Sequence, residues 1–234
     1  MSDEGVTAAI AALQDAGDHG DLCGPFLSVL PATGAAISTL GDPFGSETVC
    51  ASDAAAARLA EIQLDLGEGP CREAVRTGVP VLEPDLRGTT SERWPIALTA
   101  LRQAQLGAVF AFPMRVGTLV VGAVGLYDQR ATDLPADAVR DATAMARVAA
   151  RVVLHRALLR AESRTGYAED AGRYSRREVY QASGMLAAQT GATASDALLL
   201  LRAAAYAAGR TVRDLSADVI ARVVDFTGRG EPSR

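Results

Sequence analysis

The sequence predicts an α+β domain, with helices packed on an antiparallel sheet, followed by an all-α bundle of three helices. Two observations support this. From Gly34 to about Leu126, short extended segments alternate with short helical ones, and hairpin turns can join the extended segments. The last seventy residues are almost wholly helical in pattern. A chain of 234 residues is comfortably long enough for two domains.

The extended segments have strand-like composition. GAAISTL at 34–40 and ETVCAS at 47–52 flank the turn-rich tip GDPFGS, which suits a hairpin. PVLEPDL at 80–86 predicts a brief strand, and 107–128 predicts two strands joined at the turn RVG. Helices are expected at 53–66, 71–78 and 97–107. This order favours an antiparallel sheet, and neither a dinucleotide-binding glycine motif after a strand nor a lysine-containing phosphate loop is present.

A long helix is predicted from about 135 to 164. One set of its residues is spaced by 3, 4, 3 and 4, as in a two-helix seam. This set is Met145, Val148, Val152, His155 and Leu159. Two interpretations are open: the stripe packs on the preceding sheet, or it pairs with a second copy in a coiled coil.

Three further helices are predicted at about 175–190, 195–208 and 212–226. Gly191 and Gly209 end the first two. Thr193 and Thr211 then serve as N-caps, each with an aspartate three residues later, Asp196 and Asp214. The apolar faces of these helices are rich in alanine, so the bundle has a small core.

Composition limits the class of protein. No apolar run approaches the roughly 20 residues of a membrane helix, and the first residues lack the pattern of a secretory signal, so we expect a cytoplasmic protein. Cys23, Cys50 and Cys71 are far apart and form no metal-binding motif. We therefore expect reduced thiols, with neither a disulfide framework nor a zinc site.

Charge is distributed unevenly along the chain. Residues 1–163 hold 13 arginines and 20 acidic residues, whereas 164–234 hold ten arginines and eight acidic residues. Every cationic side chain other than histidine is arginine, a bias that a GC-rich coding sequence explains. The tail is thus mildly positive, which is modest for a nucleic-acid-binding domain.

The stretch GEGPCREAVRTGVPVLEPDL, with Trp94–Pro95 and the strand pair at 107–128, resembles a GAF domain of the actinobacterial kind. The tail from Tyr180 to Phe226 resembles the ANTAR domain, a three-helix RNA-binding module of transcription antiterminators. The expected organisation is an N-terminal segment (1–19), a GAF sensor domain (20–134), a linker helix (135–170) and an ANTAR domain (171–234).

The ANTAR resemblance rests on particular residues. The family pattern of alanine, a basic residue, glycine and two apolar residues falls on 182–186, its leucine–arginine pair on Leu201 and Arg202, and its last basic position on Arg210. Ser183 replaces a common lysine, Tyr206 a methionine and Ser216 an alanine. Loss of the lysine removes a phosphate-directed charge, which Arg173, Arg176 and Arg177 could supply instead.

RNA recognition requires cations, a flat side chain for stacking and a place where the backbone can come close. The resemblance implies that Arg202, Arg210 and Arg213 supply the cations, Tyr206 the ring and Gly184 the close approach. Each has an alternative: Tyr206 closes the bundle, Arg202 holds Asp214 or Asp218, and Gly184 lets two helices cross tightly.

The signal received by the GAF domain is not evident in the sequence. The residue sets of cyclic-nucleotide, bilin and haem sites are missing, so no cofactor is expected. Cys71 follows GEGP at a helix start and is either a redox sensor or, more simply, a buried inert thiol. No catalytic grouping is apparent and the cysteine spacing differs from that of GAF-type methionine sulfoxide reductases, so we expect a non-enzyme.

The resemblance implies a signal-responsive, homodimeric regulator that binds RNA hairpins in nascent transcripts and acts in antitermination, with an unidentified small ligand in the GAF domain. The alternatives are a dimerising protein-interaction module without RNA binding and, less simply, a GAF-type redox enzyme.

Overall fold

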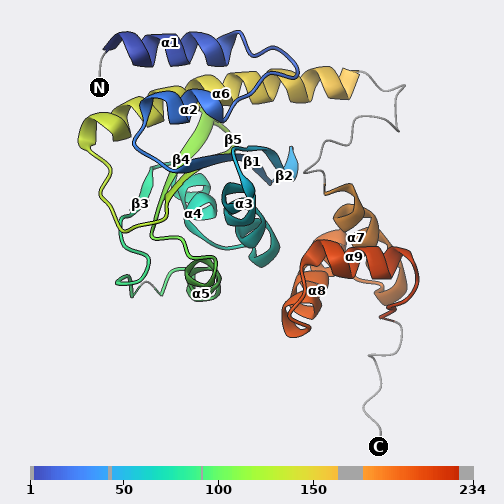
Figure 1. The fold of residues 1–234 in the computed structure, drawn as a ribbon. Helices are drawn as coiled ribbons and strands as arrows, with labels where there is room; N and C mark the ends of the chain where they lie inside the picture. Colours follow the sequence, from blue (N-terminus) through green and yellow to red (C-terminus); the bar gives the residue numbers. More distant parts are fainter. Residues whose placement is uncertain (1–2, 42–43, 91, 163–175, 227–234) are drawn as a thin grey trace, which may run out of the picture. The chain divides into compact units, whose positions relative to one another are not determined.

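The computed structural model describes residues 3–41, 44–90, 92–162 and 176–226, without the side chains of 161 and 162 (Figure 1). The chain divides into two compact units, Met1–Glu169 and Asp170–Arg234. In chain order the elements are α1 (Asp3–Gln14), α2 (Gly24–Val29), β1 (Gly34–Gly41), β2 (Gly45–Ala51), α3 (Ala54–Leu66), α4 (Pro70–Thr77), β3 (Val81–Glu83), α5 (Pro95–Gln103), β4 (Ala108–Val116), β5 (Leu119–Asp128), α6 (Ala136–Glu162), α7 (Arg177–Thr190), α8 (Ala194–Ala207) and α9 (Val212–Ile220).

The first unit is built on a five-stranded sheet with strand order β2-β1-β5-β4-β3. Every neighbouring pair is antiparallel, as the sequence predicts. The turn between β4 and β5 contains Gly117 at φ 61°, a left-handed conformation that glycine adopts without strain. Strands β1 and β2 are joined by the expected hairpin, and β2 is an edge strand because it pairs only with β1.

Helices cover both faces of this sheet (Figure 1). On one face, α1, α2 and α6 pack against strand residues that include Ile37, Phe110 and Val124. On the other, α3 and α5 pack with Trp94 and Val109. Successive residues of β4 point to opposite faces and nearly all are buried, which explains its continuous apolar sequence.

No helix is predicted from the sequence for the first 30 residues. The structure corrects this, because α1 and α2 lie there. Ala9 and Leu13 of α1 are buried, and α1 packs along α6. The N-terminal residues therefore contribute to the core of the first unit.

The long helix predicted at about 135–164 is α6. Met145 and Val148 are buried against the sheet, whereas Val152 and Leu159 are half-buried and His155 is exposed. The first half of the stripe therefore packs on the preceding domain, as one of the two interpretations predicted. Pairing of its second half in a coiled coil remains a prediction.

The second unit is the bundle α7–α9, whose core joins residues of all three helices. They are Val179, Ala182, Leu186, Ala197, Leu201, Ala205, Val212, Leu215, Val219 and Phe226. Both predicted N-caps are confirmed: the amides of Asp196 and Asp214 donate to the hydroxyls of Thr193 (3.2 Å) and Thr211 (3.0 Å). Gly191 and Gly209 adopt the left-handed conformation expected after a helix.

The last helix is shorter than predicted. Helix α9 ends at Ile220, six residues before the expected end at Phe226, and Arg222 has a φ of 58°. The amide of Val223 bonds back to the carbonyl of Asp218, which closes the helix end. Phe226 is nonetheless buried in the bundle core, so its apolar spacing reports packing and not helix.

The expectation of three reduced thiols is wrong for two of the cysteines. Cys23 and Cys50 form a disulfide, with sulfurs 2.07 Å apart and Cα atoms 6.2 Å apart. The two residues are 27 positions apart and meet only because α2 packs beside the β1–β2 hairpin, so no local motif announces the pair. Cys71 is a free, buried thiol. Within the described ranges, no helix is long and apolar enough to cross a membrane.

Candidate nucleic-acid interface

Ser183 and Gly184, adjacent in α7, face opposite environments. Ser183 is only 4% exposed, and its hydroxyl donates to the carbonyl of Ala194 (3.0 Å) at the first residue of α8. The side chain joins two helices inside the bundle, which disfavours its predicted place on an RNA-binding surface. Gly184 is exposed, and a Cβ built on it would meet nothing within 4 Å. Tight crossing of helices at Gly184 does not occur within the described bundle.

Ser183→Ala is expected to lower the free energy of unfolding of the bundle by about 1 kcal/mol, because the hydrogen bond that joins α7 to the Ala194 carbonyl of α8 is lost. The matched control is Ser216→Ala. Ser216 is equally buried, but its hydroxyl donates to the Val212 carbonyl in its own helix. Its removal should change stability little or raise it slightly. Thermal unfolding followed by circular dichroism checks both, and equal effects would contradict the assigned role of Ser183.

Tyr206 projects from α8 and is 61% exposed. A ring that closed the bundle would be buried, so this structure favours the stacking interpretation of Tyr206. Ala203 lies one turn and Leu199 (57% exposed) two turns before it on the same helical face. We call Leu199, Ala203 and Tyr206 the α8 stripe.

The arginines predicted to contact phosphates differ in accessibility. Arg177 and Arg210 are exposed and Arg202 and Arg213 half-buried, whereas Arg176 is 4% exposed at the start of α7. Burial makes Arg176 a poorer phosphate ligand than Arg177 or Arg210 in this conformation, and its RNA-binding role stays a prediction. Arg173 lies outside the described residues.

Arg210 is held in place by α9. Its guanidinium donates to the Asp218 carboxylate (2.7 Å) and to the Asp214 carbonyl (3.2 Å). These are the two aspartates that the sequence offers as partners of Arg202, and both are contacted by Arg210. The ion pair fixes the direction of the Arg210 side chain and lowers the net positive charge at this corner of the bundle.

Tyr180 is a surface aromatic residue that was not among the predicted site residues. Tyr180 is 45% exposed and lies one helical turn before Gly184. The spacing of four residues between this tyrosine and the helix-interior glycine was the signal that could have found it. Arg177 lies one turn earlier on the same face, so we call Arg177, Tyr180 and Gly184 the α7 stripe.

The possible redox role of Cys71 can be judged from its surroundings. Cys71 lines a small cavity between the sheet and helices α3 and α4, where its amide donates to Gln63 Oε1 (2.7 Å). Burial raises the pKa of the thiol to about 11, against a weaker lowering by Gln63 and Arg72. The reactive thiolate is therefore rare at neutral pH, which favours the inert alternative.

Comparisons with known proteins bear on both units. A family model for the GAF domain matches residues 8–153, and one for the ANTAR domain matches 173–220. No curated protein matches the chain. GAF domains are sensor modules and ANTAR domains are RNA-binding antiterminator modules, and their combination is typical of regulatory, non-enzymatic proteins.

Two solved structures with a TM-score of 0.50 support the fold of the first unit. The chromophore-binding domain of a bacteriophytochrome from R. palustris aligns with a TM-score of 0.50 and 11% identity, over 68% of this chain and 61% of that one. The corresponding domain from Stigmatella aurantiaca has a TM-score of 0.49 and 12% identity, over 64% of this chain and 59% of that one. The GAF domain of Acinetobacter phosphoenolpyruvate-protein phosphotransferase has a TM-score of 0.50 and 11% identity, over 72% of this chain and 100% of that one.

The chain thus spans about three fifths of each bacteriophytochrome domain, and at these identities the likeness concerns the fold alone. The GAF model covers more than half of the chain and agrees with the antiparallel sheet and its helices. The ANTAR model falls on the bundle that carries the α7 and α8 stripes. This chain belongs to the GAF domain family, and an ANTAR domain follows its GAF domain.

Proposed function

We propose that the chain is a homodimeric, cytoplasmic regulator in which the ANTAR domain binds RNA hairpins in nascent transcripts and promotes antitermination, while the GAF domain receives the signal through an unidentified small ligand. The observation that supports RNA binding most strongly is Tyr206, whose ring projects from the ANTAR bundle. A large aromatic side chain left in water by a domain of an RNA-binding family has an obvious use as a base platform.

The α8 stripe provides a continuous surface for unstacked bases. Tyr206 offers a π-face, while Leu199 and Ala203 extend the apolar surface by two turns. Arg202 precedes Tyr206 by one turn, and its half-buried guanidinium lies close enough along the helix to meet the phosphate of a base stacked on the ring. Loop bases of a hairpin are the part of RNA that such a surface recognises.

The α7 stripe adds close approach of the backbone. Because nothing lies within 4 Å of a Cβ built on Gly184, the helix surface is bare there. Tyr180 flanks this bare position on one side and the exposed Arg177 lies one turn further along. A sugar or phosphate can therefore come nearer to the helix at Gly184 than at any side-chain-bearing position of the stripe.

Charge alone supports only modest affinity for each ANTAR domain. Ten arginines face eight acidic residues in 164–234, and Arg210 is neutralised by Asp218. A homodimer would present two such domains, and binding of two linked hairpins would raise the overall affinity by avidity. We therefore propose paired hairpins as the target.

Gly184→Ala is expected to weaken hairpin binding about threefold or more, because the new methyl group occupies the bare surface. The same change should raise the stability of α7 by up to about 1 kcal/mol, since alanine is the better helix former. Lost binding therefore cannot be attributed to unfolding. A gel-shift titration with a paired-hairpin RNA, beside thermal unfolding, checks both; a more stable variant with unchanged affinity would contradict the role of Gly184.

The alternative is a protein-interaction module that no longer binds RNA. It is favoured by the exposed leucines of α8, Leu199 and Leu200, and by the serine at position 183 in place of the common lysine. Such a module should bind a protein partner through α8 with little dependence on salt, whereas RNA binding must weaken as salt rises. The two functions are separated by the same titration repeated at several salt concentrations.

A further inference from the structure

The Cys23–Cys50 disulfide connects two peripheral parts of the GAF domain. Cys23 immediately precedes α2 and is buried, whereas Cys50 lies in the edge strand β2 and is half-buried. The bond therefore ties the α1–α2 segment to the open edge of the sheet. Because Cys50 is half-buried whereas Cys23 is 1% exposed, Cys50 is the more approachable of the two.

The α1–α2 segment is also hydrogen-bonded to α6. The guanidinium of Arg156 donates to three of its backbone carbonyls, those of Gly17 (2.7 Å), Gly20 (2.9 Å) and Ala16 (3.3 Å). Burial lowers the pKa of Arg156 below its usual value, partly opposed by nearby Asp18. One side chain near the end of α6 thus holds the whole loop that ends at Cys23.

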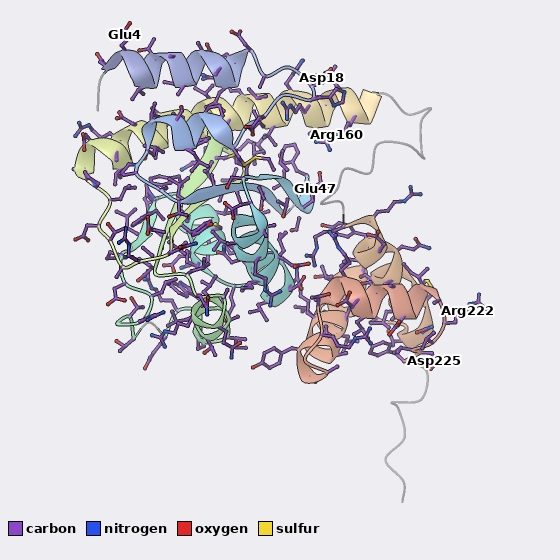
Figure 2. All side chains as sticks on the ribbon, viewed as in Figure 1. Glu4, Asp18, Glu47, Arg160, Arg222 and Asp225 are labelled. Atoms are coloured by element: carbon purple, nitrogen blue, oxygen red, sulfur yellow. A yellow bond between two sulfur atoms is a disulfide. The ribbon has the colours of Figure 1, made fainter. Side chains whose placement is uncertain are left out.

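The other side of the disulfide is attached to the same end of α6. Arg160 donates to the carboxylate of Glu47 (3.4 Å), three residues before Cys50 in β2. Asp18, Glu47 and Arg160 lie together at this end of the domain (Figure 2). Both chain segments that meet in the disulfide therefore contact the last two turns of α6, immediately before the residues that lead to the ANTAR domain.

We propose that Cys23–Cys50 is a reversible thiol–disulfide site whose redox state sets how firmly the last two turns of α6 are held. With the disulfide intact, the α1–α2 loop and β2 form one cross-linked support for Arg156 and Arg160. After reduction the two supports are independent, and each can move away from α6 at the cost of a few partly exposed polar contacts.

The chemistry is exchange with a dithiol reductant. A thiolate of the reductant attacks Sγ of Cys50, a mixed disulfide forms, and Cys23 leaves as a thiolate that takes up a proton. The second thiol of the reductant then attacks the mixed disulfide and releases Cys50 as a thiol, so the reductant leaves as its own disulfide. Two electrons and two protons pass to the protein, and a low-molecular-weight disulfide reverses the reaction by the same steps.

The test compares hydrogen exchange in the full chain before and after treatment with dithiothreitol. Amides of 154–160 and of 16–22 are expected to exchange about fivefold or more faster in the reduced protein, whereas those of the central strand β4 should not change. Oxidised dithiothreitol or glutathione disulfide should restore the original pattern. Mass spectrometry after alkylation identifies the released thiols as Cys23 and Cys50, since Cys71 is buried and reacts slowly.

Variants separate a switch from a static cross-link. Cys23→Ser/Cys50→Ser should show the fast exchange without reductant. Arg156→Ala should show it while the disulfide is intact, whereas Arg151→Ala, an exposed arginine of the same helix, should not. Unchanged exchange at 154–160 in both the reduced protein and the double serine variant would overturn the proposal. Because exchange is measured without RNA, its outcome is independent of the proposed RNA binding.

Discussion

Replacing Arg93 with methionine is expected to lower the free energy of unfolding of the GAF domain by about 2–3 kcal/mol. Arg93 donates to Glu73 (2.9 Å) and to Glu83, whose side chains are only 11% and 8% exposed. Removing the cation leaves two carboxylates largely buried without it, which is the costly way to break an ion pair. We expect a loss closer to about 2 kcal/mol than to about 3 kcal/mol, because the Arg93 side chain is itself 50% exposed.

The effect should reach beyond the ion pairs. The second oxygen of Glu73 accepts from the indole of Trp94 (2.7 Å), and that of Glu83 accepts from the Thr89 hydroxyl (2.9 Å). These bonds attach the loop between β3 and α5 to helix α4 and to strand β3. Trp94 is buried and is the single tryptophan of the chain, so its fluorescence during a urea titration reports unfolding of the GAF domain.

Arg58→Met is the matched control. Arg58 pairs with Glu61 one turn away at 3.7 Å, and the two side chains are 50% and 30% exposed. Such a surface pair contributes about 0.5 kcal/mol or less. If Arg93→Met and Arg58→Met shift the unfolding midpoint equally, the Glu73–Arg93–Glu83 network does not have the structural role assigned to it.

Tyr206→Ala is expected to lower the affinity for a paired-hairpin RNA about tenfold or more. Loss of one aromatic stacking platform removes about 1–3 kcal/mol of binding free energy. The helical content should stay the same, because the ring is 61% exposed and contributes little to the core. Arg202→Ala should weaken binding in the same assay.

Tyr206→Phe provides the control, because it keeps the ring and removes only the hydroxyl. Its affinity should remain within about twofold of the wild type if stacking is the contact that matters. Equal affinities of the wild type, Tyr206→Ala and Arg202→Ala in a gel-shift titration would show that the α8 stripe is not the RNA-binding surface. A loss with Tyr206→Phe as large as that with Tyr206→Ala would indicate a hydrogen bond instead.

The strands and helices of both domains could be predicted because their signals are local. Alternating apolar residues, turn residues and capping threonines such as Thr193 each act within a few positions. The helices α1 and α2 were not predicted; their place in the core depends on packing of α1 on α6 and of α2 on α1 and β1, which the folded domain provides. The predicted extension of the last helix to Phe226 failed for a related reason, since apolar spacing does not distinguish helix from packed loop.

The candidate site was predicted less completely because accessibility is a tertiary property. Sequence position alone placed Ser183 beside Gly184 on one surface, although a rotation of 100° per residue turns one inward and leaves the other bare. Arg176 was likewise taken as accessible and is buried. The Cys23–Cys50 bond depends on contact between segments that only the folded domain brings together.

We propose above that the ANTAR domain of this chain binds RNA hairpins through phosphate and stacking contacts. The most direct test is a titration of the full chain with a paired-hairpin RNA over a series of salt concentrations. We expect a complex at low salt, and we expect its log affinity to fall linearly with log salt concentration because each neutralised phosphate releases a counterion. Absence of a complex at the lowest salt, or an affinity that does not change with salt, would contradict it.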